Sequence, residues 1–388
     1  MATSINVKNI GNRDEFPTRR IVVKFSKRIK TSPDIPEVVE VDYQPEKKQG
    51  ISAASLEEIN KFFKNVSDKY TPELEPIVVE EAEGKEIILN ETSNDVDIKV
   101  KLSRNYGGID PKATVSICNL SQSIINQLAT IEFAPKWSRT ITVYAGYETK
   151  GQETSDIPLL FSGTILWAIP TTGRPDVWFT IQAVEQFFEQ NAILKIENKS
   201  IESKSAFAPF FVAQTAVFCG YKKSQIDLSY FNQLYRSSQP NRLKEYMIAD
   251  INNYSYNSTF GNFLKKEVFQ WGRMSAAQMS DKLILLPCSA DMDFLENDED
   301  KSTLPVISAR SNPTMIGIPK PNPTGVDFTT LFDTSVLLPM RRFRLNSFIF
   351  PMFDDFVYWV QKVDYDLHLR GQPFYNHVVA RRKVQRAK

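Results

Sequence analysis

The chain has 388 residues, with 47 Lys and Arg against 46 Asp and Glu, so its formal net charge is +1. Hydrophobic residues make up 42% and charged residues 24%, which is typical of globular proteins and argues against a disordered chain. The balanced charge argues against a dedicated nucleic-acid binder, and the length suits two or three domains.

Cysteine and histidine are scarce. Cys118, Cys219 and Cys288 are far apart and form no C-x-x-C motif, which argues against a zinc cluster and a disulfide scaffold. We expect synthesis in a reducing cytosol. The first residues lack the apolar stretch of a signal peptide, and no run of 18 uncharged apolar residues predicts a membrane span.

Residues 1–85 are the first predicted domain, an N-terminal extension. Residues 19–30 are basic and partly alternating, which predicts an edge strand or an arm. Ser55 and Glu58 form a capping box that predicts a helix with one apolar stripe, ending before Pro72. This helix either docks on a neighbouring subunit or packs on its own domain. The acidic run that follows, to Glu86, predicts a solvated linker.

Residues 86–190 are the second predicted domain, with an apolar period of two. A short helix after Ser121 and turns at Gly146 and Gly173 interrupt the strands. One short helix among several strands predicts a small barrel or a curled sheet. The strands are predicted at residues 98–102, 114–118, 140–144, 160–169 and 178–183.

Residues 191–303 are predicted to form a mixed helical insertion. A helix near 205–218 has Pro209 in its first turns, and a second helix begins after Ser258 as cap and stops at Gly272. The remaining predictions for this domain are a polar loop over 235–257, a strand over 282–286 and an acidic loop over 291–300.

Residues 304–388 return to β structure, which makes the chain mainly β with helical insertions (α+β). Strands are predicted at 305–307, 343–345, 357–363 and 377–380, with a passage punctuated by Pro and Gly over 317–326.

The two β regions show a weak internal repeat. Each has a strand, a Trp-bearing strand, a Gly-x-Pro loop and a closing strand that ends in Ala. The similarity indicates either a duplicated unit or chance among β sequences. If the unit is duplicated, three chains offer six similar units around one axis. The compared segments are 139–143, 166–168, 173–175 and 178–183 in the first region, and 342–345, 358–360, 371–373 and 374–380 in the second.

Few side chains suggest catalysis. His368 and His377 lie beside arginines without a Ser-Asp partner, which favours polar surface roles. Asp364 and Asp366 share a strand face and are the better candidates for the carboxylate pair of a glycosidase. Asp354 and Asp355 are adjacent on the chain and point to opposite faces of a strand.

Other motifs are incomplete. Asp291 and Asp293 begin like a calcium loop, but Leu295 and Glu296 stand where an acid and a glycine are required. There is no phosphate-binding loop and no nucleophile elbow. The basic residues 381–383 suit nucleic acid, an acidic partner or a solvated terminus. The sequence therefore predicts no catalytic residue, no cofactor and no metal ligand.

Three passages resemble the baseplate (tail) hub family of contractile-tailed bacteriophages, which is related to the hub part of type VI secretion spike proteins. Their order and spacing over residues 86–380 carry the resemblance. The passages are 113–121 (ATVSICNLS) with 141–147 (ITVYAGY) and 160–165 (LFSGTI); 260–264 (FGNFL) with 282–287 (KLILLP); and 307–310 (ISAR) with 315–319 (MIGIP), 325–328 (GVDF) and 337–345 (LLPMRRFRL).

The resemblance implies a structural, non-enzymatic protein of the virion, made in the host cytoplasm. It implies two tube-like β-barrel domains per chain, over 86–190 and 304–388, and a homotrimer with pseudo-sixfold symmetry. Such a trimer joins the hexameric tail tube to the trimeric central spike and leaves a channel for DNA in transit. Tape measure and baseplate wedge proteins are further expected partners, and residues 1–85 are expected to reach a neighbouring baseplate chain.

Two other functions remain open from the residues. One is a carbohydrate-active β protein of the tail tip that uses Asp364 and Asp366. The other is a glycan-binding module that uses exposed Trp167 or Trp178.

Overall fold

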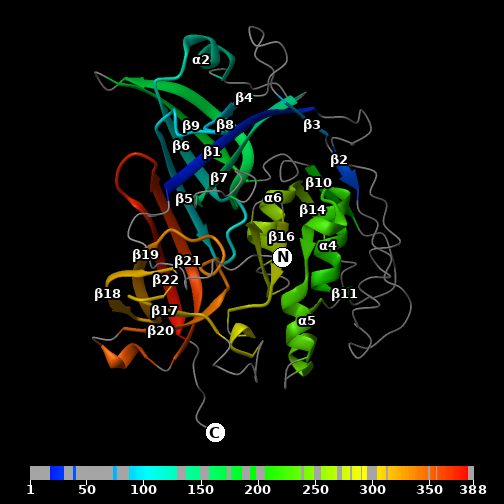
Figure 1. The fold of residues 1–388 in the computed structure, drawn as a ribbon. Coiled ribbons are helices and arrows are strands. Elements are labelled where there is room, and N and C mark those ends of the chain that lie inside the picture. The colour runs from blue at the N-terminus through cyan, green and yellow to red at the C-terminus, as the bar shows by residue number, and fades with distance from the viewer. Residues whose placement is uncertain are drawn as a thin grey trace.

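The computed structural model is mainly β with few helices (Figure 1). It describes residues 18–29, 38–40, 73–76, 87–128, 137–148, 157–172, 176–185, 193–197, 206–236, 240–248, 255–268, 273–279, 282–289, 291–294, 304–311, 313–347, 350–354 and 356–382. The predicted helix after Ser55 and the turn at Gly173 lie outside the described residues.

One fourteen-stranded sheet dominates the fold. Its main path runs β18-β19-β22-β21-β5-β6-β9-β8-β7-β1-β3, with β4 beside β1, β20 beside β21, and β17 beside β20. Neighbours are antiparallel except β17 and β20. The strands are β1 (Thr18–Ile29), β3 (Glu73–Pro76), β4 (Ile87–Leu89), β5 (Ile98–Asn105), β6 (Lys112–Cys118), β7 (Trp137–Glu148), β8 (Leu159–Thr172), β9 (Val177–Val184), β17 (Val306–Ser308), β18 (Met315–Asn322), β19 (Gly325–Leu331), β20 (Arg342–Asn346), β21 (Val357–His368) and β22 (Phe374–Arg382).

The sheet contains two five-stranded units with the same strand order. We call β5 to β9 the first unit and β18 to β22 the second unit. The spatial order is β7-β8-β9-β6-β5 in the first and β20-β21-β22-β19-β18 in the second. In each unit the first two strands form a hairpin, and the last three strands form a meander that folds back beside it.

The registers of the two units also match. A bulge follows the pair Ile165–Ala183 in the first unit, and a bulge follows the pair Val360–Ala380 in the second. These pairs make Ala183 equivalent to Ala380, as the sequence repeat predicts. The tryptophans are not equivalent, because Trp167 follows the bulge of its unit and Trp359 precedes the bulge of the other.

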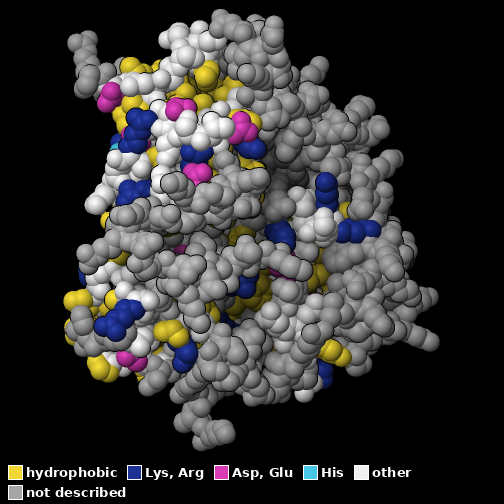
Figure 2. Space-filling model, viewed as in Figure 1, with side chains coloured by type: hydrophobic (Ala, Val, Ile, Leu, Met, Phe, Trp, Pro, Cys, Tyr) yellow, Lys and Arg dark blue, Asp and Glu magenta, His cyan; other side chains and the backbone are white. Residues whose placement is uncertain are grey.

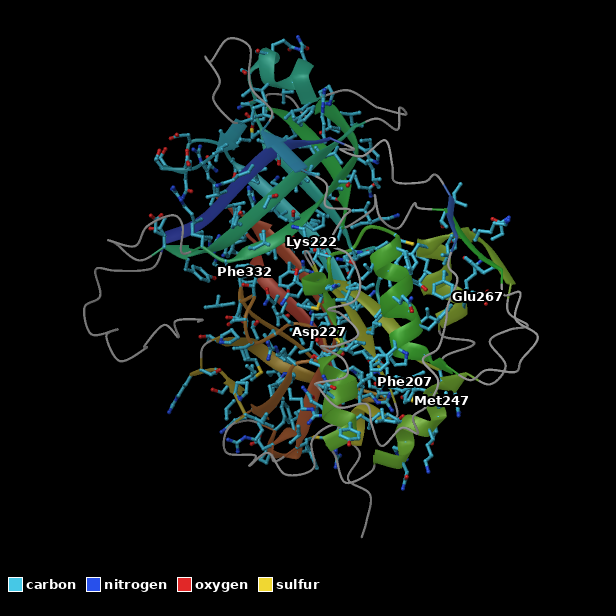
Figure 3. The ribbon with its side chains drawn as sticks, turned by 90° about the vertical axis from the view of Figure 1, so that its right-hand side faces the viewer. Phe207, Lys222, Asp227, Met247, Glu267 and Phe332 are labelled. Atoms are coloured by element: carbon cyan, nitrogen blue, oxygen red, sulfur yellow. The ribbon has the colours of Figure 1, made fainter. Side chains whose placement is uncertain are left out.

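Both units are joined along one edge and share one hydrophobic cluster. The second half of β21 pairs with β5, and apolar residues of both units fill the same core. Phe332, which Figure 3 labels where the two units meet, packs edge-on against Tyr365 and Phe374. The path of described strands is open at both ends, so the predicted pair of tube-like barrels is not confirmed by them.

The insertion has a separate hydrophobic cluster and lies beside the large sheet (Figure 1). Its helix α4 starts with Pro209 in its first turn, as predicted, and its short strands β11 and β13 pair Phe207 with Met247, which lie side by side in Figure 3. The elements are β10 (Ile193–Glu197), β11 (Ala206–Phe207), α4 (Ala208–Phe218), η5 (Lys223–Gln225), β12 (Ile226–Asp227), α5 (Ser229–Arg236), η6 (Pro240–Tyr246), β13 (Met247–Ile248), β14 (Ser255–Thr259), α6 (Phe260–Asn262), η8 (Phe263–Glu267), β15 (Ser275–Met279), β16 (Lys282–Leu286) and η9 (Asp291–Phe294). Outside the insertion lie β2 (Val38–Glu40), α2 (Gln122–Leu128) and η11 (Pro351–Phe353).

Several local predictions are corrected. The basic segment 19–30 is no edge strand or arm, because β1 pairs with β7 on one side and with β3 and β4 on the other. Gly146 lies within β7 and makes no turn. The polar segment 235–257 contains η6 and the start of β14 where a loop was expected. The cap of α6 is Thr259, whose hydroxyl accepts a hydrogen bond from the Asn262 N–H, and not Ser258.

Candidate functional surface

One face of the large sheet is apolar and the other is polar, because the strands alternate between buried and accessible residues. In β5 the buried residues Ile98, Val100 and Leu102 alternate with Lys99 and Lys101. We call the accessible side the polar face. Across six neighbouring strands it carries Asp327, Thr329, His377, Asp364, Asp366, Lys99, Lys101, Thr114, Ser116, Thr180 and Gln182.

The lysines of the polar face have local partners. Lys101 Nζ lies 3.7 Å from Asp366 Oδ2, and Lys362 Nζ lies 2.8 Å from Asp364 Oδ2. Lys99 Nζ stands 3.9 Å from the centre of the Trp178 ring, a cation–π contact. Each of these three lysines therefore sits beside a carboxylate or an aromatic ring.

The predicted carboxylate pair does not form a glycosidase site. Asp364 and Asp366 share the polar face as expected, but each is partly exposed and pairs with its own lysine. A retaining or inverting glycosidase needs two carboxyl groups that face a bound sugar, one of them held protonated. Nothing in this arrangement supplies that environment.

The two histidines have structural partners. His368 Nε2 lies 2.9 Å from Asp97 Oδ2, and the Arg370 backbone N–H also donates to Asp97. His377 Nδ1 lies 3.3 Å from Thr329 Oγ1 across neighbouring strands. The Asp97 carboxylate therefore ties the β21–β22 turn to the segment that precedes β5.

The two tryptophans proposed for glycan binding are engaged. The Trp167 indole N–H donates to Gln182 Oε1 at 2.7 Å. Trp178 holds Lys99 on its ring and has His368 at its edge. A stacked sugar needs a free aromatic face, so neither ring favours the glycan-binding hypothesis.

The remaining candidates also have structural roles. Asp354 accepts a hydrogen bond from the Ser347 backbone N–H at 2.8 Å, and Asp355 lies outside the described residues. Asp291 is buried and bonds to Arg242 and to the Tyr246 hydroxyl, which fixes η9 inside the insertion. The acidic loop predicted over 291–300 is therefore wrong for residues 291–294, which form η9, and residues 295–300 lie outside the described residues.

The three cysteines are free thiols, and Cys219 is buried. Within the described ranges, no group of three or more His, Cys, Asp and Glu is arranged to hold a metal ion. No helix in the described part of the chain has the length and apolarity to cross a membrane.

A buried ion pair sits in the first unit, close to its junction with the second. Arg104 on β5 pairs with Glu185 after β9, and both side chains are at most 3% exposed. Arg104 also donates to the Leu160 carbonyl of β8 at 2.7 Å, and its guanidinium lies over the Tyr365 ring of β21. Burial raises the pKa of Tyr365 to about 12. Sequence patterning missed this centre, because an Arg in an alternating strand reads as a surface residue.

The comparison with solved structures finds phage tail and secretion proteins. The 43 kDa tail protein of prophage MuSo2 from Shewanella oneidensis shares 8% identity, with 74% of this chain and 96% of that chain covered and a TM-score of 0.39. A tail protein from Neisseria meningitidis MC58 shares 8%, with 77% and 94% covered and a TM-score of 0.40. The Francisella PdpA–VgrG complex shares 9%, with 96% and 59% covered and a TM-score of 0.48.

The family assignment rests on sequence. No curated protein matches the chain. The model of the baseplate hub gp41 family matches residues 77–267 and 291–380, which is well over half of the sequence. The protein is thus a structural component of a phage tail. It belongs to the baseplate hub gp41 family.

Proposed function

We propose that three copies of this chain form a non-enzymatic ring that adapts the hexameric tail tube to the trimeric central spike. The observation that carries the proposal is the duplication of the strand order, β7-β8-β9-β6-β5 and β20-β21-β22-β19-β18. A trimer of chains with two equivalent units presents six similar units to a sixfold partner and three identical chains to a threefold one.

The polar face is proposed to line the channel through which DNA passes. A surface that attracted phosphates would release counterions and hold DNA, which would slow its passage. The pairing of Lys101 with Asp366 and of Lys362 with Asp364 lowers that attraction. The apolar face would lie on the outside of the channel wall, covered by the shared hydrophobic core.

The tube-like barrel belongs to the assembly in this proposal. The path of described strands in one chain is open at both ends, and sheets of three chains arranged edge to edge would close into one wall. The proposed place is the virion, after synthesis in the host cytoplasm. Tape measure and wedge proteins are proposed as further partners, with residues 1–85 reaching toward a neighbouring baseplate chain.

The mass of the purified full chain in solution tests the proposal. Light scattering coupled to size exclusion is expected to give three times the 44.4 kDa of one chain. A stable monomer at micromolar concentration, or binding of the chain to a glycan array, contradicts it.

A further inference from the structure

The junction between the two units inside one chain follows a simple rule. The first part of β21 pairs with β20, and this ladder ends at the pair Arg342–Trp359. After the bulge, the second part of β21 pairs with β5, from Lys362 opposite Asn105 to His368 opposite Lys99. β21 therefore pairs with β20 before the bulge and with β5, the edge strand of the first unit, after the bulge.

In the first unit β8 is the equivalent of β21, but no described strand takes the place that β5 has beside β21. The ladder between β7 and β8 ends at the pair Thr140–Thr164. This pair is equivalent to Arg342–Trp359, because Thr164 and Trp359 each lie two residues before the bulged residue of their strand. Beyond it, residues 165–172 of β8 pair with β9 on one side. On the other side no described strand pairs with them.

The second unit contains an equivalent of β5, the strand that pairs with β21. Its edge strand β18 is the equivalent of β5, since both form a hairpin with the next strand, and among the described strands of the sheet it pairs with β19 alone. Among the described strands, a chain thus has one edge without a neighbour and one edge strand that could supply it. The two are on different units, as a head-to-tail ring requires.

We infer that β18 of one copy lies along residues 167–172 of β8 in the next copy, in the arrangement that β5 and β21 have within the chain. This inference rests on the proposed trimer and names its joint. The contact is heterologous, so each copy uses both edges once and the ring closes after three copies.

The side chains at these edges distinguish the joint between copies from the joint within the chain. The register makes Ile316 of β18 equivalent to Lys99, and Ile169 of β8 equivalent to Asp364. Both isoleucines are accessible, at 37% and 40%, and Ile318 in the β18 bulge is 51% exposed. Figure 2 shows hydrophobic side chains at the lower left, where Figure 1 places β18. In this register Ile169 of one copy lies beside Asn322 of the other, and both isoleucines lie on the side of the sheet that carries the polar face.

Prolines limit which strands these edges accept. Pro170 lies in the free part of β8, and Pro319 and Pro321 lie in β18. Proline has no backbone N–H, so neither edge offers the full ladder on which indiscriminate strand pairing depends. The joint between copies therefore has fewer main-chain hydrogen bonds than a full ladder and depends more on side-chain packing.

The equivalence also predicts which residues face one another. Within the chain, Lys101 lies opposite Asp366 and pairs with it at 3.7 Å. Their equivalents are Lys320 and Thr171, both exposed. Directly opposed residues of an antiparallel pair have Cα atoms about 4.5–5.5 Å apart, within the range that a disulfide spans.

A disulfide test reads this register directly. The double variant Thr171→Cys with Lys320→Cys is expected to form covalent dimers and trimers on mild oxidation, seen on a non-reducing gel. The two single variants and the pair Thr171→Cys with Lys112→Cys serve as controls, since Lys112 is exposed on a strand with neighbours on both sides. Cross-linking in the controls to the same extent overturns the inference.

A second test addresses the isoleucines. Ile316→Asp is expected to raise the monomer fraction about tenfold or more at equal concentration, because association of the β18 edge with the next copy removes the new carboxylate from water. Ile193→Asp is the matched control, since Ile193 is 41% exposed in the insertion. If the wild-type chain is a trimer, but the specific cross-link does not form and Ile316→Asp also stays trimeric, the inferred joint is wrong. The proposed trimer is not affected by that result. A monomeric wild-type chain overturns the proposed function itself.

Discussion

The Arg104–Glu185 pair shows how one buried charge can connect elements that are far apart in sequence. Arg104 reaches the end of β9, the Leu160 carbonyl of β8 and the Tyr365 ring of the second unit. Removing two charges from water costs several kcal/mol per ion, and only mutual pairing and hydrogen bonds offset this cost. The pair therefore fixes the relative position of these strands only while both partners are present.

Replacing one partner should destabilise the fold strongly. Arg104→Met leaves Glu185 charged and buried, and the free energy of unfolding should fall by about 3–5 kcal/mol. Urea denaturation followed by circular dichroism measures the loss. The double variant Arg104→Met with Glu185→Leu is expected to recover most of it. Equal losses in the single and double variants would show that the charge left behind is not the cause.

Tyr365 gives the fold a dependence on alkaline pH. Its pKa is raised from the ordinary 10 to about 12 by burial. Between these values the unfolded chain releases the proton and the folded chain keeps it, so stability is full below pH 10 and declines as the pH rises. The decline is about 2–3 kcal/mol from this residue.

The variant Tyr365→Phe is expected to show a shallower decline in unfolding free energy between pH 10 and 12 than the wild type. Tyr375→Phe, at a half-buried position on the neighbouring strand β22, is the control. An unchanged slope in Tyr365→Phe would assign the alkaline loss to other groups.

At the scale of elements, the two units have the same plan with different residues at equivalent places. Gly325 on β19 and Lys112 on β6 are equivalent. Gly325 lies opposite Arg381 and Lys112 lies opposite Val184, and these two residues directly follow the equivalent alanines Ala380 and Ala183. A Cβ on Gly325 would stand 2.1 Å from the Ala380 carbonyl oxygen, whereas the first unit accommodates a full lysine side chain there. The backbone of β22 thus lies too close to Gly325 for a side chain at this point.

Gly325→Ala should therefore cost about 1–3 kcal/mol of unfolding free energy, because the contact is with backbone that cannot easily move aside. Lys112→Ala, the matched change in the first unit, should leave stability within about 0.5 kcal/mol. Thermal or urea unfolding of both variants measures the difference. Equal effects would refute the proposed difference in backbone spacing.

Sequence patterning predicts elements well where alternation is regular, and it fails where local signals conflict with tertiary pairing. The strands β5, β6, β9 and β16 match their predicted positions. Apolar and polar residues alternate in β5, β6 and β9, and β16 is a short continuous run of apolar residues. β18 was not expected, since Gly317 and Pro319 are typical of turns and here lie in an edge strand with a bulge. The repeat was visible through Ala183 and Ala380, but no residue pattern reveals the bulges that set the true equivalence.

The polar face was predictable in part. Alternation places Lys99, Lys101, Asp364 and Asp366 on accessible sides of their strands, and the sequence indicates that much. That Asp366 meets Lys101 depends on the pairing of β21 with β5 across 250 or more residues of chain, which no local signal encodes. A carboxylate pair on one strand thus resembles a catalytic site in sequence and forms two ion pairs in the fold.

At the scale of the whole molecule, charge balance on the polar face is proposed to let DNA pass. The double variant Asp364→Asn with Asp366→Asn frees Lys362 and Lys101 while keeping side-chain size. It should bind duplex DNA more tightly than the wild type at low salt, with an affinity that falls steeply as salt rises.

Asp110→Asn with Glu245→Gln is the matched control for that change, because it also removes two carboxylates, from the exposed pairs with Lys265 and Arg273. A filter-binding or fluorescence anisotropy titration over a salt series compares the three proteins. If DNA binding rises equally in the control, the change in net charge explains the effect and the position of the carboxylates on the polar face does not.

A cryo-EM map of the assembled tail tests the alternating ring of units. We expect three copies of this chain in one ring between tube and spike, with six units around the axis that alternate between β5–β9 and β18–β22, and with β18 of each copy beside β8 of the next. A ring of six copies, or three copies whose two units do not superpose by a rotation of about 60°, would contradict it.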